Sequence, residues 1–419
     1  MRKDSFILGE GVEVSLNSHE TWLNNNILIV GASGSGKSRT IVEPNLYYCH
    51  GSYVISDPKG ALYKRFSGLF RLKGYNVQKL DLIRPSEGSH YNPLSFIESD
   101  RDVLKIATIL NGDNDSFSKD PFWDNAASLV LISMIYYLRE EYPKAKQTIP
   151  NVLKCLELCN KSENGRPSRM DVLMSDLALR NPKSDAVRYY RKVECAAKTY
   201  NCVLLTLQTK LGILDSSSVS EMINHSDIDF AEIGQKPTVV FVTCSDTDRS
   251  LDVIANLFFT QALNELTLFA DSQSTGELPI PVMFMMDDFA TNVVIDDFQN
   301  SIATIRSRNI STVMMIQSES QLQQCYGVTG AKTILANCDT YVYMGGNDVE
   351  TARTVSIRAD KPLSQILNMN STQCWIFRRG ENPRLCDKHT AYIKHMKELR
   401  ETVKQQIATA DTTEIEKGA

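Results

Sequence analysis

The sequence has no pattern typical of a disulfide framework or a dedicated metal site. Its ten cysteines include no C-x-x-C pair, and its six histidines form no H-E-x-x-H cluster. Cys155 and Cys159 are one helical turn apart, but no histidine lies near them in the sequence. Scattered cysteines of this kind are typical of buried, reduced thiols in a cytosolic protein, so we expect neither disulfides nor a zinc site.

Long apolar segments and an excess of positive charge are also missing. The N-terminus lacks the apolar run of a signal peptide, and the stretch Ala126–Leu138 is too short to span a bilayer. We therefore expect no membrane anchor within this sequence. The net charge is −5, from 45 basic and 50 acidic residues. Any contact with DNA must therefore come from a local patch or from a ring of subunits.

A glycine-rich pattern after an apolar run is the most informative feature that is present. It follows Ile27–Val30 and fits G-x-x-x-x-G-K-[ST], through Gly31, Ala32, Ser33, Gly34, Ser35, Gly36, Lys37 and Ser38. Glycines let backbone N–H groups converge on phosphate oxygens, and the following helix directs its positive end to the same place. The pattern predicts a nucleotide triphosphate site. The alternative is a glycine-rich turn that binds nothing.

Residues at the end of this loop have defined roles in such a site. Lys37 would reach the β- and γ-phosphates, and the Ser38 hydroxyl would complete the coordination shell of Mg²⁺. We also place the adjacent Arg39 among the nucleotide-binding residues. The predicted cofactors are therefore ATP and Mg²⁺.

A second apolar segment, Pro281–Asp288, ends in two carboxylates. A buried parallel strand that stops at an acid places that acid at the carboxyl edge of the sheet, beside the phosphate loop. Asp287 would hold Mg²⁺ through water, and Asp288 would orient or deprotonate the attacking water as a general base. Acids are also common at solvated strand ends, which is the alternative interpretation.

Polar residues around the next strand complete the candidate site. Gln317 ends that strand and would sense the γ-phosphate, although Gln317-Ser318 also fits a helix cap. Arg306 and Arg308 precede the strand, and in a ring an arginine can stabilise transition-state charge in a neighbour's site. Solvated arginines at a helix end are the common alternative. The segment Asp57–Gly60 would face the nucleotide cleft or form only a turn.

The order of strand-like and helical patterns predicts an α/β fold with an insertion. We expect a P-loop NTPase with a mostly parallel central sheet flanked by helices, plus an inserted all-α domain where helical periodicity replaces strand signals. The expected segments are a hairpin (Phe6–Leu16) and the first part of the nucleotide-binding domain in 1–98, the all-α domain in 99–226, the second part of the nucleotide-binding domain in 227–389, and a basic amphipathic helix (Thr390–Gln406) with its tail in 390–419.

Together these stretches resemble the TraG-like type IV coupling proteins, conjugation motors that are similar in their core to FtsK and HerA. The resemblance runs over residues 5 to 380. Its matching segments are Asn24–Gly31 with the phosphate loop, Ser56–Gly60, Tyr91–Leu94, Phe122–Ala126, Ser245–Asp248, Met286–Ala290, Ile302–Arg308, Gln317–Leu322 and Asn337–Asp339.

This resemblance implies a RecA-like motor that assembles as a homo-hexameric ring. It implies ATP-driven transfer of single-stranded, relaxase-bound DNA into a type IV secretion channel, with the relaxase and the channel proteins as partners. Lys37 and Ser38 fall on the family's phosphate-loop positions, and Asp287 falls on its metal carboxylate. Gln317 falls on the family's nucleotide sensor, and Arg306 falls near its arginine that acts in trans.

Two features depart from the family pattern. Family members usually begin with membrane helices, which this sequence lacks, so we expect a cytoplasmic protein that partners hold at the inner face of the membrane. Most related motors also carry glutamate where Asp288 stands. Aspartate is one methylene shorter, so its reach to the attacking water is reduced and slow turnover is expected.

Three functions compete on these observations. A DNA-translocating ATPase accounts for the complete site and the family segments. The alternative is a nucleotide-gated docking adaptor that recruits protein substrates without translocating DNA, which the missing anchor and Asp288 favour. A kinase or small GTPase-like switch fits poorly, because the sequence has no N-K-x-D guanine-binding motif and no phosphate-acceptor domain.

Overall fold

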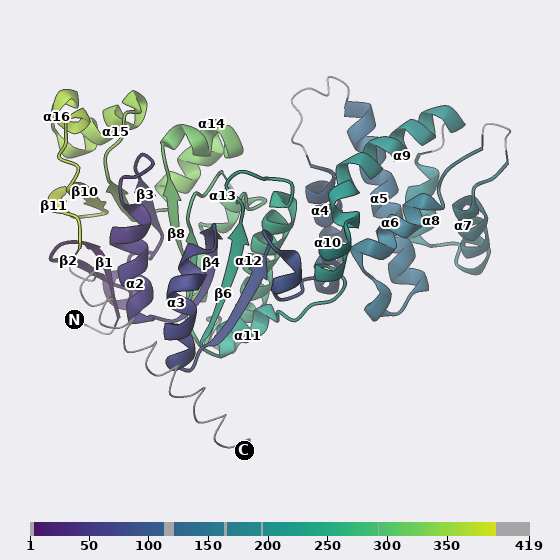
Figure 1. The fold of residues 1–419 in the computed structure, drawn as a ribbon, viewed down its shortest axis with the longest axis horizontal. Coiled ribbons are helices and arrows are strands. Elements are labelled where there is room, and N and C mark those ends of the chain that lie inside the picture. The colour runs from purple at the N-terminus through teal and green to yellow at the C-terminus, as the bar shows by residue number, and fades with distance from the viewer. Residues whose placement is uncertain (1–3, 113–120, 163–165, 194–195, 292, 391–419) are drawn as a thin grey trace, which may run out of the picture. The chain divides into compact units, whose positions relative to one another are not determined.

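The computed structural model describes residues 4–112, 121–162, 166–193, 196–291 and 293–390 (Figure 1). This part of the chain forms two compact units. Unit 1 comprises the chain up to Lys79, Phe230–Thr243 and the chain from Leu266 onward, and unit 2 comprises Leu80–Asp229 and Cys244–Glu265. Nearly all of the predicted basic helix Thr390–Gln406 lies outside the described residues, so that helix stays a prediction.

A sheet of nine strands, in the order β11-β10-β9-β3-β8-β7-β4-β6-β5, forms the centre of unit 1. Strand β3 pairs in parallel with β8 and β9, β7 pairs in parallel with β4 and β8, and β10 is antiparallel to β9 and β11. The prediction of a mostly parallel sheet is therefore confirmed. The strands are β3 (Ile27–Val30), β4 (Ser52–Pro58), β5 (Asn76–Asp81), β6 (Thr238–Cys244), β7 (Val282–Met286), β8 (Ile310–Ile316), β9 (Thr340–Tyr343), β10 (Gln373–Arg378) and β11 (Arg384–Asp387).

Helices cover the sheet because its central strands are apolar along their whole length. Every residue of β3, β7 and β8 is buried, which is typical of parallel strands covered on both faces. One face shares a hydrophobic core with the hairpin β1 (Ser5–Gly9)–β2 (Val12–Ser15) and with α2 (Glu43–Tyr48) and α3 (Ala61–Leu72), which lie over the strands in Figure 1. The other helices of unit 1 include α1 (Ser18–Thr21), α11 (Phe230–Gln235), α13 (Phe298–Ser301), α14 (Glu319–Ala336), α15 (Val349–Ala359) and α16 (Leu363–Leu367).

Two of the segments that carried the family resemblance hold the starts of the strands together. The Asn24 side-chain oxygen accepts from the backbone N–H groups of Asn26 and Asp339, each at 3.1 Å, and the Asp339 carboxylate accepts from the Asn24 N–H at 2.6 Å. The Asn26 side-chain oxygen accepts from the backbone N–H of Thr312 at 3.1 Å. These asparagines therefore fix β3, β8 and β9 in register, which is a structural role.

Unit 2 is helical, as the periodicity predicted. In the described part of 99–226 the regular elements are α-helices and short 3₁₀ helices. Capping boxes begin two of them, with Ser99 and Asp102 at α4 and Ser168 and Asp171 at α7. The helices are α4 (Asp100–Asn111), α5 (Pro121–Glu141), α6 (Ile149–Glu157), α7 (Arg169–Arg180), α8 (Asp185–Arg191), α9 (Ala197–Leu211) and α10 (Ser217–Met222).

Helix α12 (Asp252–Ser272) is longer than the apolar segment 126–138 considered from the sequence. Among the described residues it alone is long and apolar enough to cross a membrane by length and composition. In the structure 61% of its most apolar stretch is buried within the protein. Core helices of folded proteins have this length, composition and burial, so α12 is explained as a core helix.

Candidate nucleotide-binding site

The glycine-rich loop lies at the carboxyl edge of the parallel sheet, as predicted. The Gly31 N–H donates to the carbonyl of Ile316 at 3.1 Å, at the end of β8. The Ala32 N–H donates to the carbonyl of Gly345 at 2.9 Å, just beyond β9. The chain then turns into a π-helical segment, Ser38–Val42, and continues as α2. Both strands that flank β3 therefore fasten the start of the loop.

The glycines of the loop are required by its conformation and by its packing. Gly34 and Gly36 have φ angles of +77° and +92°, in the region that favours glycine. Gly31 has a different reason: a Cβ there would lie 2.6 Å from the Ser35 Oγ and 2.9 Å from the Met344 Cβ. A larger residue at 31 would have to displace its neighbours.

Lys37 is buried at this loop, with 7% of its surface exposed. Its ammonium donates to the carbonyl of Gly31 at 2.6 Å and to that of Ala32 at 3.3 Å. Burial lowers the pKa of Lys37, while the charges of Asp288 and Asp287 act in the opposite direction. A buried cation that is bonded mainly to carbonyl oxygens is well placed to exchange them for the charged oxygens of a phosphate.

Ser38 and Asp287, the two predicted metal ligands, are in direct contact although 249 residues separate them in the sequence. The Ser38 hydroxyl donates to the Asp287 carboxylate at 2.5 Å. Burial raises the pKa of Asp287, the Ser38 hydrogen bond lowers it, and the charge of Asp288 raises it further. A hydroxyl and a carboxylate at this spacing offer two oxygen ligands of the kind that Mg²⁺ takes.

Two further carboxylates lie beside Asp287. Asp288 is held with a φ of +51°, and its N–H donates to the Asp287 carboxylate at 3.2 Å. Asp57 is buried and accepts from the N–H groups of Leu62 and Tyr63 at 2.9 and 2.7 Å, so it caps α3. Burial raises the pKa of Asp57 to about 6, and the charge of Asp287 adds to the effect. The segment Asp57–Gly60 therefore forms the turn that caps α3 and also places a carboxylate beside Asp287.

The remaining loop and sensor residues lie at the same edge. Gln317 follows β8 with an exposed side chain, and its N–H donates to the Gln321 side chain at 2.8 Å. Ser33 and Arg39 are exposed. The Ser35 hydroxyl is buried and has no hydrogen-bond partner among the described residues, which fits a loop whose donors serve a bound anion.

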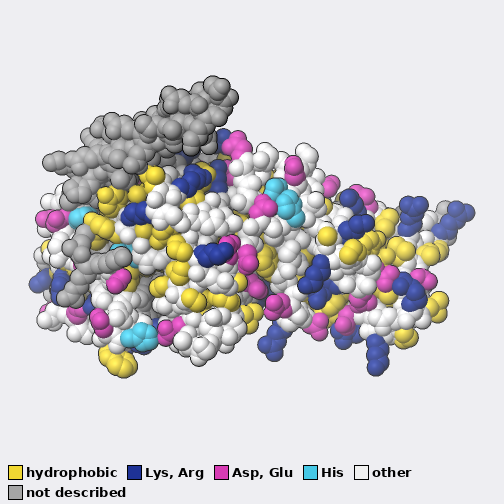
Figure 2. All heavy atoms as spheres, turned by 90° about the horizontal axis from the view of Figure 1, so that it is seen from below, with side chains coloured by type: hydrophobic (Ala, Val, Ile, Leu, Met, Phe, Trp, Pro, Cys, Tyr) yellow, Lys and Arg dark blue, Asp and Glu magenta, His cyan; other side chains and the backbone are white. Residues whose placement is uncertain are grey.

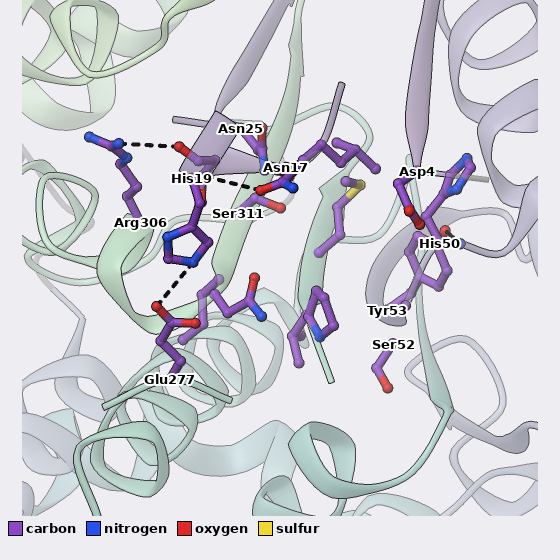
Figure 3. A pocket seen from close by; sticks show the side chains of 18 residues that line it. Asp4, Asn17, His19, Asn25, His50, Ser52, Tyr53, Glu277, Arg306 and Ser311 are labelled. Atoms are coloured by element: carbon purple, nitrogen blue, oxygen red, sulfur yellow. Dashed lines mark hydrogen bonds and ion pairs between the residues drawn. The ribbon is translucent and has the colours of Figure 1, made fainter. Parts of the chain in front are cut away.

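Arg306 lies at the opposite edge of the sheet, before β8 begins. It is one of the residues that line a cavity of about 310 Å³, in which its guanidinium donates to the Ser18 carbonyl at 3.5 Å (Figure 3). An ion pair between His19 and Glu277, at 3.3 Å, lies in the same cavity. Arg308 instead forms a two-pronged ion pair with Asp271.

The position of Arg306 separates it from the phosphate loop of its own chain. Arg306 precedes the amino end of β8, whereas the phosphate loop contacts Ile316 at the carboxyl end of that strand, and the seven residues of β8 extend roughly 20 Å. Of the predicted catalytic residues, the structure thus brings together Lys37, Asp287 and Asp288, with Gln317 at the same edge, but not Arg306.

A lysine that the sequence did not mark also contacts the loop. The Lys388 ammonium donates to the carbonyls of Ser35, Met344 and Ser371 at 2.9, 3.1 and 2.8 Å, and only 8% of the residue is exposed. Burial lowers the pKa of Lys388. It directly follows the short strand β11, where a lysine would ordinarily be exposed, so no local sequence pattern marked it.

The fold and this constellation define a class of protein. A phosphate loop after β3 faces an acid at the end of β7, with β8 between the two strands, which is the RecA-like P-loop NTPase arrangement. The family model for type IV secretory system conjugative DNA transfer matches residues 2–359. The chain therefore belongs to that family, and the resemblance inferred from the sequence is confirmed.

Known relatives agree with this assignment. The chain is 21% identical over 347 residues to the conjugal transfer protein TraG of Escherichia coli, in a match that covers 79% of this chain and 54% of TraG. It thus spans about half the length of that relative.

Solved structures of the plasmid coupling protein TrwB share the fold. The TrwB complex with the non-hydrolysable ATP analogue ADPNP superposes with a TM-score of 0.67 at 15% identity, covering 93% of this chain and 90% of that one. The TrwB complex with ADP and Mg²⁺ gives a TM-score of 0.66 at the same identity and coverage. The predicted fold class, a RecA-like P-loop NTPase, is therefore confirmed.

Proposed function

We propose that this protein is an ATP-hydrolysing coupling protein that drives relaxase-bound, single-stranded DNA into a type IV secretion channel. The observation that carries the proposal is the 2.5 Å contact between Ser38 and Asp287 beside the buried ammonium of Lys37. Membership of the conjugative DNA transfer family supports the cargo, and the nucleotide complexes of TrwB support ATP and Mg²⁺ as the cofactors.

The residues of the loop would bind and orient the nucleotide. Backbone N–H groups between Gly31 and Gly36 donate to phosphate oxygens, and the Lys37 ammonium leaves the loop carbonyls for the β- and γ-phosphates. The Ser38 hydroxyl and, through water, the Asp287 carboxylate would hold Mg²⁺. When bound, this ion neutralises charge on the phosphates.

Hydrolysis would depend on three further residues. Asp288 accepts the proton of the attacking water, and Gln317 senses the γ-phosphate. Arg306 acts on the site of the neighbouring subunit in a homo-hexameric ring, because it lies at the edge opposite its own phosphate loop. Such a ring has a repeated head-to-tail interface, so each nucleotide lies between two subunits.

The charge distribution suits DNA binding by a ring better than by an isolated chain. On the face drawn in Figure 2, Lys and Arg side chains are interspersed with Asp and Glu. The net charge of −5 gives no general attraction to DNA. Loops from several copies around a central channel would supply the contacts to the strand. We place this ring in the cytoplasm, at the inner face of the membrane, through partners in the secretion channel.

The test is ATP hydrolysis by the purified protein with and without single-stranded DNA. We expect turnover that DNA stimulates and that Lys37→Ala abolishes. Lys332→Ala changes an exposed lysine of α14 and serves as the matched control, with unchanged turnover. Turnover that persists in Lys37→Ala, or that ignores DNA, would contradict the proposal.

The short acid at position 288 favours a second function, a nucleotide-gated docking adaptor. Asp288 has a left-handed backbone and one methylene fewer than glutamate, so it reaches less far toward the attacking water. An adaptor would bind nucleotide and capture a relaxase without turnover that depends on DNA. Asp288→Glu separates the two functions, because it should accelerate hydrolysis in a motor and leave partner capture by an adaptor unchanged.

A further inference from the structure

Two histidines and an aspartate meet in unit 2, although His90 is distant in sequence from His225 and Asp227. The His90 Nδ1 lies 2.7 Å from one Asp227 carboxylate oxygen, and the His225 Nε2 lies 3.4 Å from the other. The two imidazole rings stack with their centroids 3.9 Å apart. One ligand atom from each residue can be chosen so that all three lie within 4.8 Å of one another.

The backbone, and not chance contact of surface side chains, holds this cluster together. The His90 N–H donates to the Asp227 carboxylate at 2.9 Å, and the Asp227 N–H donates to the His90 carbonyl at 3.0 Å. Two residues further on, the Asn92 N–H donates to the Ser226 hydroxyl at 2.9 Å. The cluster therefore lies where two chain segments are fastened side by side, which pre-organises its ligand atoms.

We propose that His90, His225 and Asp227 form a binding site for a borderline divalent cation, with Zn²⁺ as its representative. Two imidazoles and one carboxylate are ligands that Zn²⁺ takes readily. Ligand atoms on a tetrahedral zinc lie about 3.3 Å apart, and one ligand atom from each of the three residues lies within 4.8 Å of the others. Rotation of the side chains would bring the three ligand atoms to the spacing that a tetrahedral zinc requires.

The exposure of the three side chains suits an ion that enters from solvent. His90, Asp227 and His225 are 29%, 45% and 56% exposed. An ion therefore has a path to all three, and water can fill the fourth position of the tetrahedron. Mg²⁺, the cation of the proposed nucleotide site, prefers oxygen ligands and would not compete well here.

The ion would link segments 137 residues apart in sequence. Closing so long a loop makes metal binding and folding of unit 2 cooperative.

The test is a titration of the full-length, metal-free, reduced protein with Co²⁺, followed by displacement with Zn²⁺ in a calorimeter. Co²⁺ reports its ligands by visible absorption, and a bound thiolate adds a near-ultraviolet band, which separates this site from exposed Cys202 and Cys325. We expect one Co²⁺ per chain without the thiolate band. His90→Gln, His225→Gln and Asp227→Asn should each lower the affinity tenfold or more.

Two controls make the result specific. His19→Gln changes an exposed histidine that also has an acidic partner, Glu277, and should bind as the wild type does. Asp287→Asn removes the proposed nucleotide-site ligand and should also leave this binding unchanged, so failure here and failure of the proposed function can be told apart. Absence of saturable binding, or equal affinity in His225→Gln and the wild type, would overturn the proposal.

Discussion

Two buried lysines meet at the phosphate loop from opposite ends of the chain. Lys37 donates to the carbonyls that open the loop, and Lys388 donates to the carbonyl of Ser35 in its middle. Lys37 is free to exchange its carbonyl partners for phosphate because its place in the loop is fixed by the backbone. Lys388 also donates to two carbonyls outside the loop, so it acts as a positioning residue that keeps the loop in shape.

Lys388→Met is expected to weaken nucleotide binding without removing any proposed catalytic group. The substitution leaves three carbonyls without their charged donor and costs about 1.5–3 kcal/mol of stability. Binding of a fluorescent ATP analogue measures the effect, and Lys332→Met, at an exposed site, is the matched control. If the variant lost stability but bound nucleotide as tightly as the wild type, Lys388 would be a structural residue only.

Asp57 is expected to make stability fall as the pH rises through mildly acidic values. Its pKa is raised to about 6 from 3.8 by burial, so the native state binds the proton more tightly than the unfolded state does. The free energy of unfolding should therefore decrease between pH 4 and pH 6, by at most about 3 kcal/mol. Urea unfolding across this range should show a shallower decrease in Asp57→Asn. The exposed Asp360→Asn is the control, and an identical slope in Asp57→Asn would contradict the assignment.

At the scale of elements, the buried strand β3 was predictable and the exposed strand β11 was not. The run Ile27–Val30 became β3 with the same bounds, and the apolar segment 281–288 contains β7, because strands buried on both faces read as continuous apolar segments. Strand β11 was not predicted. Three of the four residues of β11 are exposed, so no apolar signal marks it.

The candidate site shows the same division. Lys37, Ser38 and Asp287 were predictable, because a local motif and a strand end specify them and the parallel sheet brings them to one edge. Lys388 could not be predicted, since its partners lie on three other segments. The histidine cluster of unit 2 was likewise invisible, because 135 residues separate His90 from His225 and only the fold joins them.

Gly31→Ala tests the loop as a packed element. A Cβ at this position would lie 2.6 Å from the Ser35 Oγ and 2.9 Å from the Met344 Cβ, so we expect a loss of about 1–3 kcal/mol together with weaker nucleotide binding. Gly212→Ala is the matched control, because its Cβ would meet nothing within 4 Å and its φ is −58°. There we expect no loss, or a gain of about 0.4–1 kcal/mol. Chemical denaturation measures both variants, and equal stabilities would contradict the packing argument.

At the scale of the whole molecule, unit 1 carries the proposed catalytic residues on two different edges of one sheet. The carboxyl edge carries the phosphate loop with Lys37 and Asp287, and the amino edge carries Arg306 beside a cavity of about 310 Å³. A head-to-tail ring places the amino edge of one copy against the carboxyl edge of the next. In the proposed ring neither edge would be a complete catalytic site alone, so turnover should rise cooperatively with protein concentration.

Mixing two inactive variants tests this arrangement directly. Lys37→Ala removes a group from the carboxyl edge and Arg306→Ala removes one from the amino edge, so each homogeneous ring should be inactive. In a random mixture, roughly one quarter of the interfaces join an intact Lys37 to an intact Arg306, and ATPase activity should return to about that fraction. Lys37→Ala and Asp287→Asn both change the nucleotide site at the carboxyl edge. In a mixture of these two variants every nucleotide site carries one of the substitutions, so no ATPase activity should return. Recovery in both mixtures, or in neither, would exclude a nucleotide site completed by the neighbouring subunit's Arg306.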